Sequence, residues 1–450
     1  MAPKIDPQNL RETFGRFRVL IVGRANAGKT TILQKVCNTT EKPEIYDAKG
    51  RKVWLEIDAQ RGNHEITNEM VFKSNSGFVF HDSCGFEAGS VEEFEEMKRF
   101  ISERANATKL EERLHAIWYC IPMDDHCRTF QRSEEKFFSE CNTGNVPIIA
   151  VFTKFEALCP VAFGELEDEF IGLSSEECLK RIAHRVEELF KNTQVLDRLC
   201  DINNLAHPKG YVRLENMNQP NTNCDTLVEC TTFALDDKEL RLYLVSTQQS
   251  NLELCIKCAV GVLVNHAHWQ LLPRPTDHEA YQLDLAKWFL HLYLTERSVT
   301  ALVVPRQMPN NHGVCYSLLV MHHWYTDTPN FIDFIQLFNT LTWRGEFLSI
   351  LQPLARNGTW FTTANGILRI GIAATILVLE YSAFLRHDSD DELGFMKSAV
   401  DHYVKSPTAI AVEKVAREIT DRGYKKEELK TKILEFILEN RMSKELLTKK

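Results

Sequence analysis

The sequence predicts an α/β fold for residues 16–268, followed by a mostly helical region at residues 281–450. Two observations support this. Short runs of branched and aromatic apolar residues, typical of buried strands, end in polar turns, and segments with helical spacing separate them. Beyond the first domain this alternation stops, and helical patterns follow one another. The first pattern predicts a mostly parallel sheet with helices on both faces, in which ligands bind at the carboxyl ends of the strands.

The first element is the apolar run at residues 17–23, which predicts a buried strand, and residues 30–37 then have helical spacing. Between them, residues 23–30 match G-x-x-x-x-G-K-T, whose backbone N–H groups surround a phosphate at a helix N-terminus. Lys29 is expected to reach the β- and γ-phosphate oxygens, and the Thr30 hydroxyl is expected to bind Mg²⁺. The residues assigned to this phosphate loop are Gly23, Arg24, Ala25, Asn26, Ala27, Gly28, Lys29, Thr30 and Thr31.

A second polar turn follows the apolar residues 78–80, and in it Asp82 and Gly85 form the pattern D-x-x-G. Asp82 is expected to hold Mg²⁺ through a water molecule, and the Gly85 N–H is expected to sense the γ-phosphate. Thr67 is the weaker candidate for a direct Mg²⁺ ligand. The alternative is that Thr67 lies inside a strand of a hairpin that turns at residues 75–77.

Two further turns are assigned to the base of a nucleotide. The apolar run that begins at Val146 ends in Thr153, Lys154, Phe155 and Glu156. The Glu156 carboxylate can accept hydrogen bonds from N1–H and the 2-amino group of guanine, whereas adenine offers neither donor, and the Lys154 stem can pack over the ring. A further strand is predicted at residues 242–245. A backbone N–H in the turn after it, formed by Ser246, Thr247 and Gln248, is expected to meet the guanine 6-oxo group.

The segments GRANAGKT, DSCG, TKFE and STQ, in this order, resemble the guanine-nucleotide-binding domain (G domain) of the TRAFAC class of P-loop proteins. GRANAGKT is similar to the Era- and TrmE-like GTPases. HDSCGFEAGS, TKFE and STQQSNLELC together resemble septin-like or Era-like proteins common in mushroom-forming fungi. This resemblance implies GTP or GDP as ligand, Mg²⁺ as cofactor, and GTP hydrolysis that serves as a conformational or assembly switch. Septin-like relatives pair through their nucleotide faces, so it also implies a nucleotide-dependent homodimer.

Three positions depart from the pattern of these relatives. Their base-reading motif usually ends in aspartate, and Glu156 is one methylene longer, so weaker guanine affinity is expected. After D-x-x-G many signalling GTPases carry a glutamine that orients the attacking water, and Phe86 cannot replace it, so hydrolysis without a partner is expected to be slow. Thr247 stands where a small alanine is usual, but only its backbone is needed.

Asn26 and His64 are the two weak candidates for a catalytic role. Asn26 occupies the position that TrmE-like GTPases link to an activating K⁺ ion, whose charge would act on the transferring phosphoryl oxygens. The plainer interpretation is that Asn26 tolerates a tight turn. His64 is expected in the first switch, where it would position water or contact phosphate, and the plainer interpretation is a solvated loop histidine.

Composition excludes some classes of protein. A net charge of −9 argues against a general nucleic-acid binder. Residues 1–15 form an N-terminal arm that lacks the apolar core of a signal peptide, and 13 cysteines without such a signal predict reduced thiols and a cytoplasmic location. The most hydrophobic stretch, residues 366–385, is interrupted by Arg369 and Glu380. A bilayer crossing takes about 20 apolar residues, so a central helix of the second domain is favoured over a membrane contact.

Residues 269–280 contain two prolines and predict a linker, and the role of residues 281–450 is unknown beyond the recruitment of an unidentified protein partner. Two other functions stay open. One is a P-loop ATPase or small-molecule kinase with a different base pocket. The other is a non-hydrolysing interaction module in which the nucleotide is structural or controls assembly.

Overall fold

The structure is a computed structural model that divides the chain into two compact units, Arg16–Thr247 and a second unit that takes in the chain from Gln248 onward. The limit expected at residue 268, the linker 269–280 and the arm 1–15 lie outside the described residues. The structure describes residues 16–53, 65–83, 91–125, 128–248, 252–265, 288–289, 376–379, 381–382, 394–412, 414 and 426–442.

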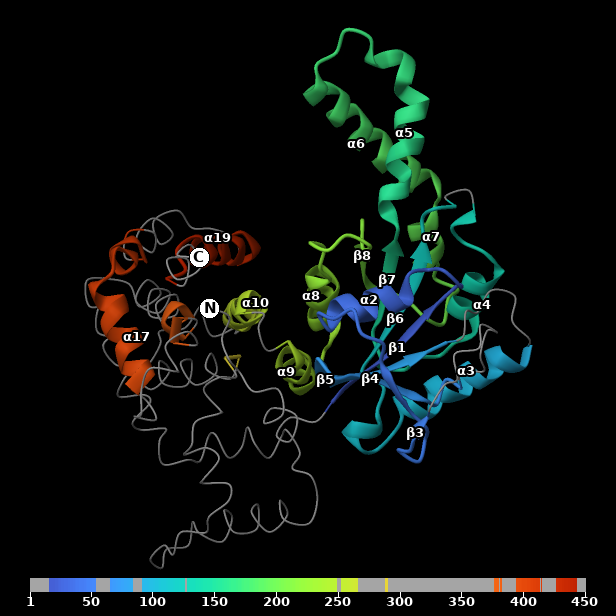
Figure 1. Cartoon of the computed structure of the whole chain (residues 1–450), viewed down its shortest axis with the longest axis horizontal. Helices are drawn as coiled ribbons and strands as arrows, with labels where there is room; N and C mark the ends of the chain where they lie inside the picture. Colours follow the sequence, from blue (N-terminus) through green and yellow to red (C-terminus); the bar gives the residue numbers. More distant parts are fainter. Residues whose placement is uncertain are drawn as a thin grey trace, which may run out of the picture. The chain divides into compact units, whose positions relative to one another are not determined.

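An eight-stranded sheet in the order β3-β2-β4-β5-β1-β6-β7-β8 forms the centre of the first unit (Figure 1). The five strands from β5 to β8 in this order are parallel, and β4, β2 and β3 extend the sheet in antiparallel fashion. The predicted mostly parallel sheet is therefore confirmed. The strands are β1 (Phe17–Gly23), β2 (Glu44–Tyr46), β3 (Lys52–Val53), β4 (Glu69–Phe72), β5 (Asn75–Asp82), β6 (Ala116–Pro122), β7 (Ile148–Thr153) and β8 (Pro208–Arg213).

Helices cover both faces of this sheet, as predicted. On one face, side chains of the parallel strands form a core with α3 (Val91–Ala105), α4 (Arg132–Glu140), α6 (Ser175–Asn192) and α7 (Val195–Leu199). On the other face lie α2 (Lys29–Val36), α8 (Asp225–Ala234) and α9 (Lys238–Thr247). There the Trp118 Nε1–H donates to Thr231 Oγ1 over 3.0 Å, which joins β6 to α8.

The strand predicted at residues 242–245 is wrong, because these residues belong to helix α9. The sequence LRLYLV alternates like a strand, but Leu240, Tyr243, Leu244 and Thr247 also follow the spacing i, i+3, i+4 and i+7 of a helix face. All four are buried in the structure. Packing of this face against β1 and β5 therefore favours the helix over the strand.

The hairpin predicted before Asp82 is confirmed, but its turn is not where the sequence placed it. Strands β4 and β5 are joined at residues 73–74, and Asn75 already pairs with Phe72. The Asn75 side chain explains this difference, because its amide donates to the Thr247 carbonyl over 2.9 Å and its Oδ1 accepts from the Gly77 N–H. Asn75 is thus fixed as the first residue of β5.

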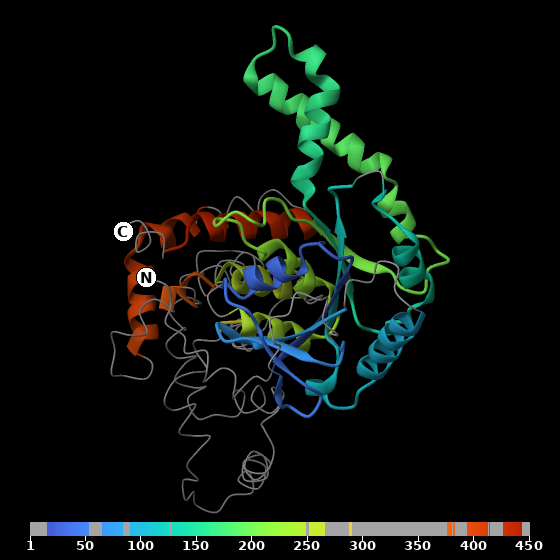
Figure 2. The ribbon, with the colours of Figure 1, turned by 45° about the vertical axis from the view of Figure 1, so that its right-hand side comes forward.

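A helical arm projects from the sheet between β7 and β8 (Figures 1 and 2). It consists of α5 (Leu158–Leu166), the short 3₁₀ helix η4 (Glu167–Phe170) and α6. Ser174 and Glu177 cap α6 reciprocally, which satisfies backbone donors at its N-terminus. The tip exposes apolar side chains, among them Ile171, which is 88% exposed, and Leu179, which is 66% exposed.

All described elements of the second unit are helices: α10 (Leu252–Asn265), which packs against α19 (Lys426–Glu439), and α17 (Gly394–Lys405). Of residues 366–385 the structure describes only 376–379 and 381–382, which are helical and buried. Within the described part of the chain, no helix combines the length and the apolar character needed to cross a membrane.

A buried histidine ties the start of β1 to the segment before β6. His115 Nδ1 accepts from the Arg18 backbone N–H over 3.0 Å, and its Nε2–H donates to the Leu110 carbonyl over 2.8 Å. Burial, reinforced by the positive charges of Arg18 and Arg113, lowers the pKa of His115 from 6.5 to about 3. The imidazole is therefore neutral in the folded protein at physiological pH.

This histidine predicts a loss of stability in mild acid. Between pH 6.5 and pH 3, His115 binds a proton in the unfolded chain but not in the folded protein. Stability therefore falls as the pH is lowered through this window. His115 alone is expected to lower the free energy of unfolding by about 1 kcal/mol on going from pH 7.5 to 5.5. Urea unfolding of wild type and His115→Phe at both pH values measures this difference. The His115→Phe variant should lose that part of the pH dependence, whereas His184→Phe, at an exposed position, should keep it.

Candidate functional site

The phosphate loop leaves β1 at Gly23 and enters α2 at Lys29. Gly23 has φ 149°, and a Cβ atom at this position would lie 2.6 Å from the Cys120 carbonyl oxygen of β6, so no other residue fits without a shift of the backbone. Asn26 and Gly28 also have positive φ, 60° and 80°. These three positions curl the backbone at the carboxyl end of β1, as the sequence predicts.

The Lys29 side chain folds back into this loop. Its Nζ donates to the Gly23 carbonyl over 2.9 Å and to the Arg24 carbonyl over 3.2 Å, and it lies 3.8 Å from Asp82 Oδ1 at the end of β5. Lys29 is buried, whereas Thr30 beside it is exposed. The ammonium group is therefore held at the centre of the loop, close to a carboxylate from the neighbouring strand.

A pocket of about 410 Å³ opens at this edge of the sheet. It brings together residues from three of the four predicted motifs, because the phosphate loop, Asp82 of β5 and Lys154 after β7 all contribute to its wall. The carboxyl ends of parallel strands meet here, where open α/β sheets bind ligands. The lining residues are Asn26, Ala27, Gly28, Lys29, Thr30, Thr31, Asp82 and Lys154.

The turn after β7 supplies the groups predicted to read a base. Lys154 has φ 52°, and its Nζ pairs with Asp124 Oδ2 over 2.5 Å, so the lysine crosses from β7 to the segment after β6. Glu156 follows in the 3₁₀ helix η3 (Phe155–Ala157). Its Oε2 atom is enclosed and has no hydrogen-bond partner among the described residues, and the same holds for Thr153 Oγ1. Two polar atoms of this turn are thus enclosed without a hydrogen-bond partner among the described residues.

The loop after β8 lies beside this turn, and the sequence did not identify it. Leu214 joins the two segments, because its N–H donates to the Phe152 carbonyl over 2.8 Å and its carbonyl accepts from the Phe155 N–H over 3.1 Å. Burial raises the pKa of the Cys159 thiol, and the carboxylates of Glu215 and Glu156 raise it further, which indicates that both lie near this thiol. Asn216 has φ 51°, and the loop continues to Gln219, whose carbonyl accepts from Lys35 Nζ of α2.

Thr247 is not brought to the pocket. Its carbonyl accepts from Asn75 at the start of β5, whereas Asp82 in the pocket ends the same strand. Seven residue steps of about 3.3 Å separate the two ends by about 23 Å. Ser246 precedes Thr247 on α9, and Gln248 begins the second unit. The expected base contact from Ser246, Thr247 and Gln248 therefore fails, because the strand that was to present them is a helix on a face of the sheet.

The two predicted switches are described only in part. His64, Gly85 and Phe86 lie outside the described residues. Thr67 lies in a turn just before β4 and not inside the strand. Because β4 runs antiparallel to β5 with Met70 opposite Phe80, the residues before β4 lie alongside the end of β5. Thr67 thus reaches the edge of the sheet that carries Asp82.

Comparisons with known proteins give no family for this chain. No family model matches it, and no curated protein matches it. Two solved structures of an oligomerised bacterial dynamin pair, described as a mechanism for the long-range sensing and tethering of membranes, are distantly similar. The first is 12% identical over 98% of this chain and 74% of that chain with a TM-score of 0.27, and the second is 11% identical over 98% and 73% with a TM-score of 0.25. The fold described above rests on the sheet and the loop themselves.

Arg24 differs from its neighbours in the phosphate loop, because its side chain turns away from the pocket. Its Nη1 and Nη2 donate to the carbonyls of Arg128 and Thr129 over 3.3 and 3.1 Å, and its Nε lies 3.2 Å from Glu134 Oε1. Glu134 is fully buried at the start of α4. The Arg24 side chain therefore anchors the loop to the segment after β6, and its carbonyl accepts from Lys29 Nζ within the loop.

Proposed function

We propose that this chain binds GTP and GDP with Mg²⁺ and acts as a slow GTPase whose nucleotide state controls conformation or assembly. The observation that carries the proposal is the pocket in which Lys29, Asp82 and Lys154 meet at the ends of β1, β5 and β7. An ammonium group, a curled backbone and a helix N-terminus at one point suit a polyphosphate. The proposal does not rest on the distant likeness to the dynamin structures.

The oxygen atoms around the loop suit Mg²⁺, which prefers a few protein oxygens together with water and phosphate. The exposed Thr30 hydroxyl at the first turn of α2 would bind the ion directly, and Asp82, 3.8 Å from Lys29, would bind it through water. Thr67 is the candidate for a further ligand, since its turn lies at the same edge of the sheet. When bound, the ion would neutralise charge on the transferring phosphate.

Guanine recognition is assigned to two segments. The enclosed Oε2 of Glu156 would accept a hydrogen bond from guanine N1–H or the 2-amino group, and the stem of Lys154 would cover the ring. For the 6-oxo group, a backbone N–H of the loop that begins at Glu215 replaces the predicted contact from α9. Adenine offers Glu156 no such donors, which makes an ATPase or kinase the second-ranked function.

Hydrolysis is proposed to be in-line attack of water on the γ-phosphate. Among the described residues, no histidine, glutamine or arginine side chain lines the pocket to orient the water or neutralise the transition state. Asn26 is exposed at the mouth of the pocket, where a K⁺ ion bound by it would help. Turnover by the protein alone should stay well below the range of about 1–100 per second of kinases and should rise when K⁺ replaces Na⁺ if Asn26 holds this ion.

The decisive experiment is a titration of the purified full-length chain with fluorescent GTP and ATP in the presence of Mg²⁺. We expect tighter binding of GTP by about 100-fold, because two charge-assisted hydrogen bonds to Glu156 are made by guanine alone. Equal affinity for both nucleotides would overturn the guanine assignment and favour the ATPase. The same samples, analysed by light scattering with GTP, GDP and no nucleotide, test the proposed nucleotide-dependent homodimer.

A further inference from the structure

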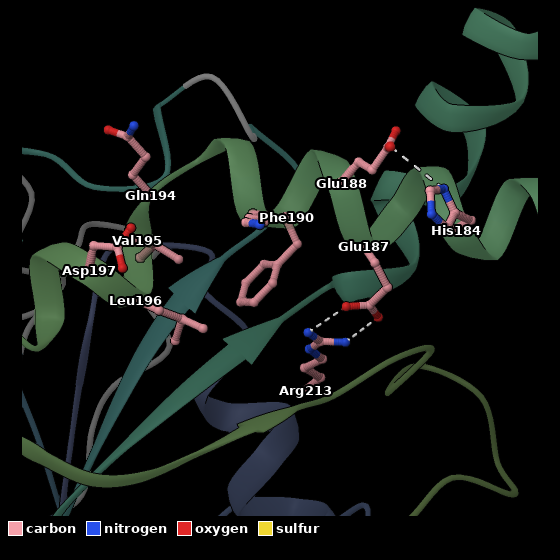
Figure 3. A pocket seen from close by; sticks show the side chains of 10 residues that line it. His184, Glu187, Glu188, Phe190, Gln194, Val195, Leu196, Asp197 and Arg213 are labelled. Carbon is pink, nitrogen blue, oxygen red and sulfur yellow. Dashed lines mark hydrogen bonds and ion pairs between the residues drawn. The ribbon is translucent and has the colours of Figure 1, made fainter.

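Arg213 ends β8 at a position that the proposed function does not use. Its guanidinium forms two hydrogen bonds with Glu187 of α6, Nη1 to Oε1 over 2.5 Å and Nη2 to Oε2 over 2.9 Å (Figure 3). Both residues line a pocket of about 590 Å³ at the root of α6 and α7, which is separate from the phosphate loop pocket. Such a two-pronged pair fixes the plane of the guanidinium, which a lysine cannot do.

The same guanidinium stacks on two aromatic rings. Its central carbon lies 4.7 Å from the ring centroid of Phe155 and 4.5 Å from that of Phe190, and the two rings contact each other edge to face at 5.3 Å. Phe190 belongs to α6, one turn after Glu187. Phe155 is only 2% exposed and stands between Lys154 and Glu156, the two residues assigned to the base. Arg213 therefore fixes the turn that carries them.

Arg213 also begins the second base segment. The next residue, Leu214, exchanges backbone hydrogen bonds with Phe152 and Phe155, and Glu215 and Asn216 follow. One side chain thus touches the turn after β7, starts the loop after β8 and reaches α6.

We propose that Arg213 is a positioning residue for recognition of the nucleotide base and that Glu187 couples this base turn to α6 and the helical arm. The proposal rests on the proposed function and adds a specificity determinant to it. Glu187 is more than half exposed, so the ion pair itself contributes little to global stability. Its effect is on geometry, because a tilt of Phe155 moves Glu156, its neighbour in the chain.

Coupling also runs in the opposite direction. If α6 favours the turn geometry that binds guanine, bound guanine must favour the same placement of α6, since linkage between two sites is reciprocal. In the arm, residues 163–185 include no buried side chain and only Ile182 packs against the core, so the arm can follow a shift at its root.

The test compares Arg213→Lys and Glu187→Gln with the matched control Arg185→Lys. Arg185 also lies on the arm and also binds two carboxylates, Glu165 and Glu188, each over 2.7 Å, but it contacts neither base segment. We measure the dissociation constants for GTP and ATP and the urea unfolding midpoint. Arg213→Lys and Glu187→Gln should weaken GTP binding about tenfold, because each disturbs the cation–π contacts and the ion pair that hold the base turn. ATP binding and the urea unfolding midpoint should not change. Arg185→Lys should change nothing.

A second readout follows backbone hydrogen exchange in α6. Adding GTP to wild type should slow exchange around Glu187 and Phe190, and this protection should disappear in Arg213→Lys at saturating GTP. An unchanged ratio of GTP to ATP affinity in Arg213→Lys would overturn the proposal, as would an equal loss for both nucleotides together with a lower midpoint. A wild-type protein without GTP preference would overturn the proposed function itself, and this inference with it.

Discussion

Lys29→Ala is expected to weaken GTP binding about 100- to 1,000-fold, which is the largest effect we predict for any single substitution. The Lys29 ammonium is held in the phosphate loop by two backbone carbonyls and lies near Asp82. Removing a buried charged partner of a phosphate costs about 3–4 kcal/mol here, since the phosphate oxygens lose a charge-assisted hydrogen bond that water replaces poorly. Titration with fluorescent GTP and GDP in the presence of Mg²⁺ measures this loss.

The matched control for this prediction is Lys180→Ala. Lys180 lies on the arm, its side chain is 73% exposed, and it pairs with Glu176, so its removal should leave nucleotide binding unchanged. Lys29→Ala should also keep the free energy of unfolding in urea within about 1 kcal/mol of the wild-type value, because an open pocket lets water solvate the carbonyls of Gly23 and Arg24. A Lys29→Ala protein that still binds GTP within threefold of wild type would show that the nucleotide binds elsewhere.

Glu156→Gln is expected to lower the affinity for guanine nucleotides and to raise the affinity for xanthine nucleotides. Guanine presents two donors, N1–H and the 2-amino group, to a carboxylate with two acceptors, whereas glutamine offers one acceptor and one donor. The variant should lose about 3 kcal/mol of GTP binding free energy, or about 100-fold in affinity. One hydrogen bond is lost, and the glutamine amide N–H faces the guanine 2-amino group, which is also a donor. Xanthine carries an oxo group in place of the amino group and matches glutamine, so affinity for xanthosine triphosphate should rise.

Titrations of wild type and Glu156→Gln with the triphosphates of guanosine, xanthosine and adenosine test this exchange. Glu165→Gln, a carboxylate on α5 that pairs with Arg185, serves as the control and should keep GTP preference. A gain for xanthosine triphosphate excludes general damage to the pocket, which would lower affinity for all three nucleotides. Unchanged GTP preference in Glu156→Gln would remove this residue from the base site.

The sequence predicted the segments in which one local motif fixes both strand and turn. The run at residues 17–23 is too apolar and too branched for anything but a buried strand, and Gly23, Gly28 and Lys29 leave one geometry for the turn after it. Asp82 and Lys154 were located in the same way, each directly after a buried apolar run. Of these residues, Gly28, Lys29, Asp82 and Lys154 line one pocket in the structure.

The strand that precedes the second base segment could not be located from the sequence. Residues 240–245 resemble a strand but form a helix, whereas the residues of β8 do not resemble a strand but form one. Residues 240–245 alternate clearly like a strand, yet their helical face is the one that packs. The true edge strand β8 begins with Pro208, Lys209 and Gly210, three residues that argue against a strand. An edge position tolerates them, since β8 pairs only with β7 among the strands of the sheet. Tertiary pairing, which no local window contains, decides this case.

The arm between β7 and β8 has a consequence for how this chain can vary in length. The hydrophobic core of the first unit includes Ala162 at the root of α5 and Val186 of α6, with Ile182 packed against it, and the tip between them, residues 163–181, contributes no side chain to this core. Shortening, lengthening or exchanging this tip would therefore alter neither the sheet nor the phosphate loop. The chain thus carries a modular extension, open to grafting and replacement, whose two ends adjoin the segments proposed to read the base.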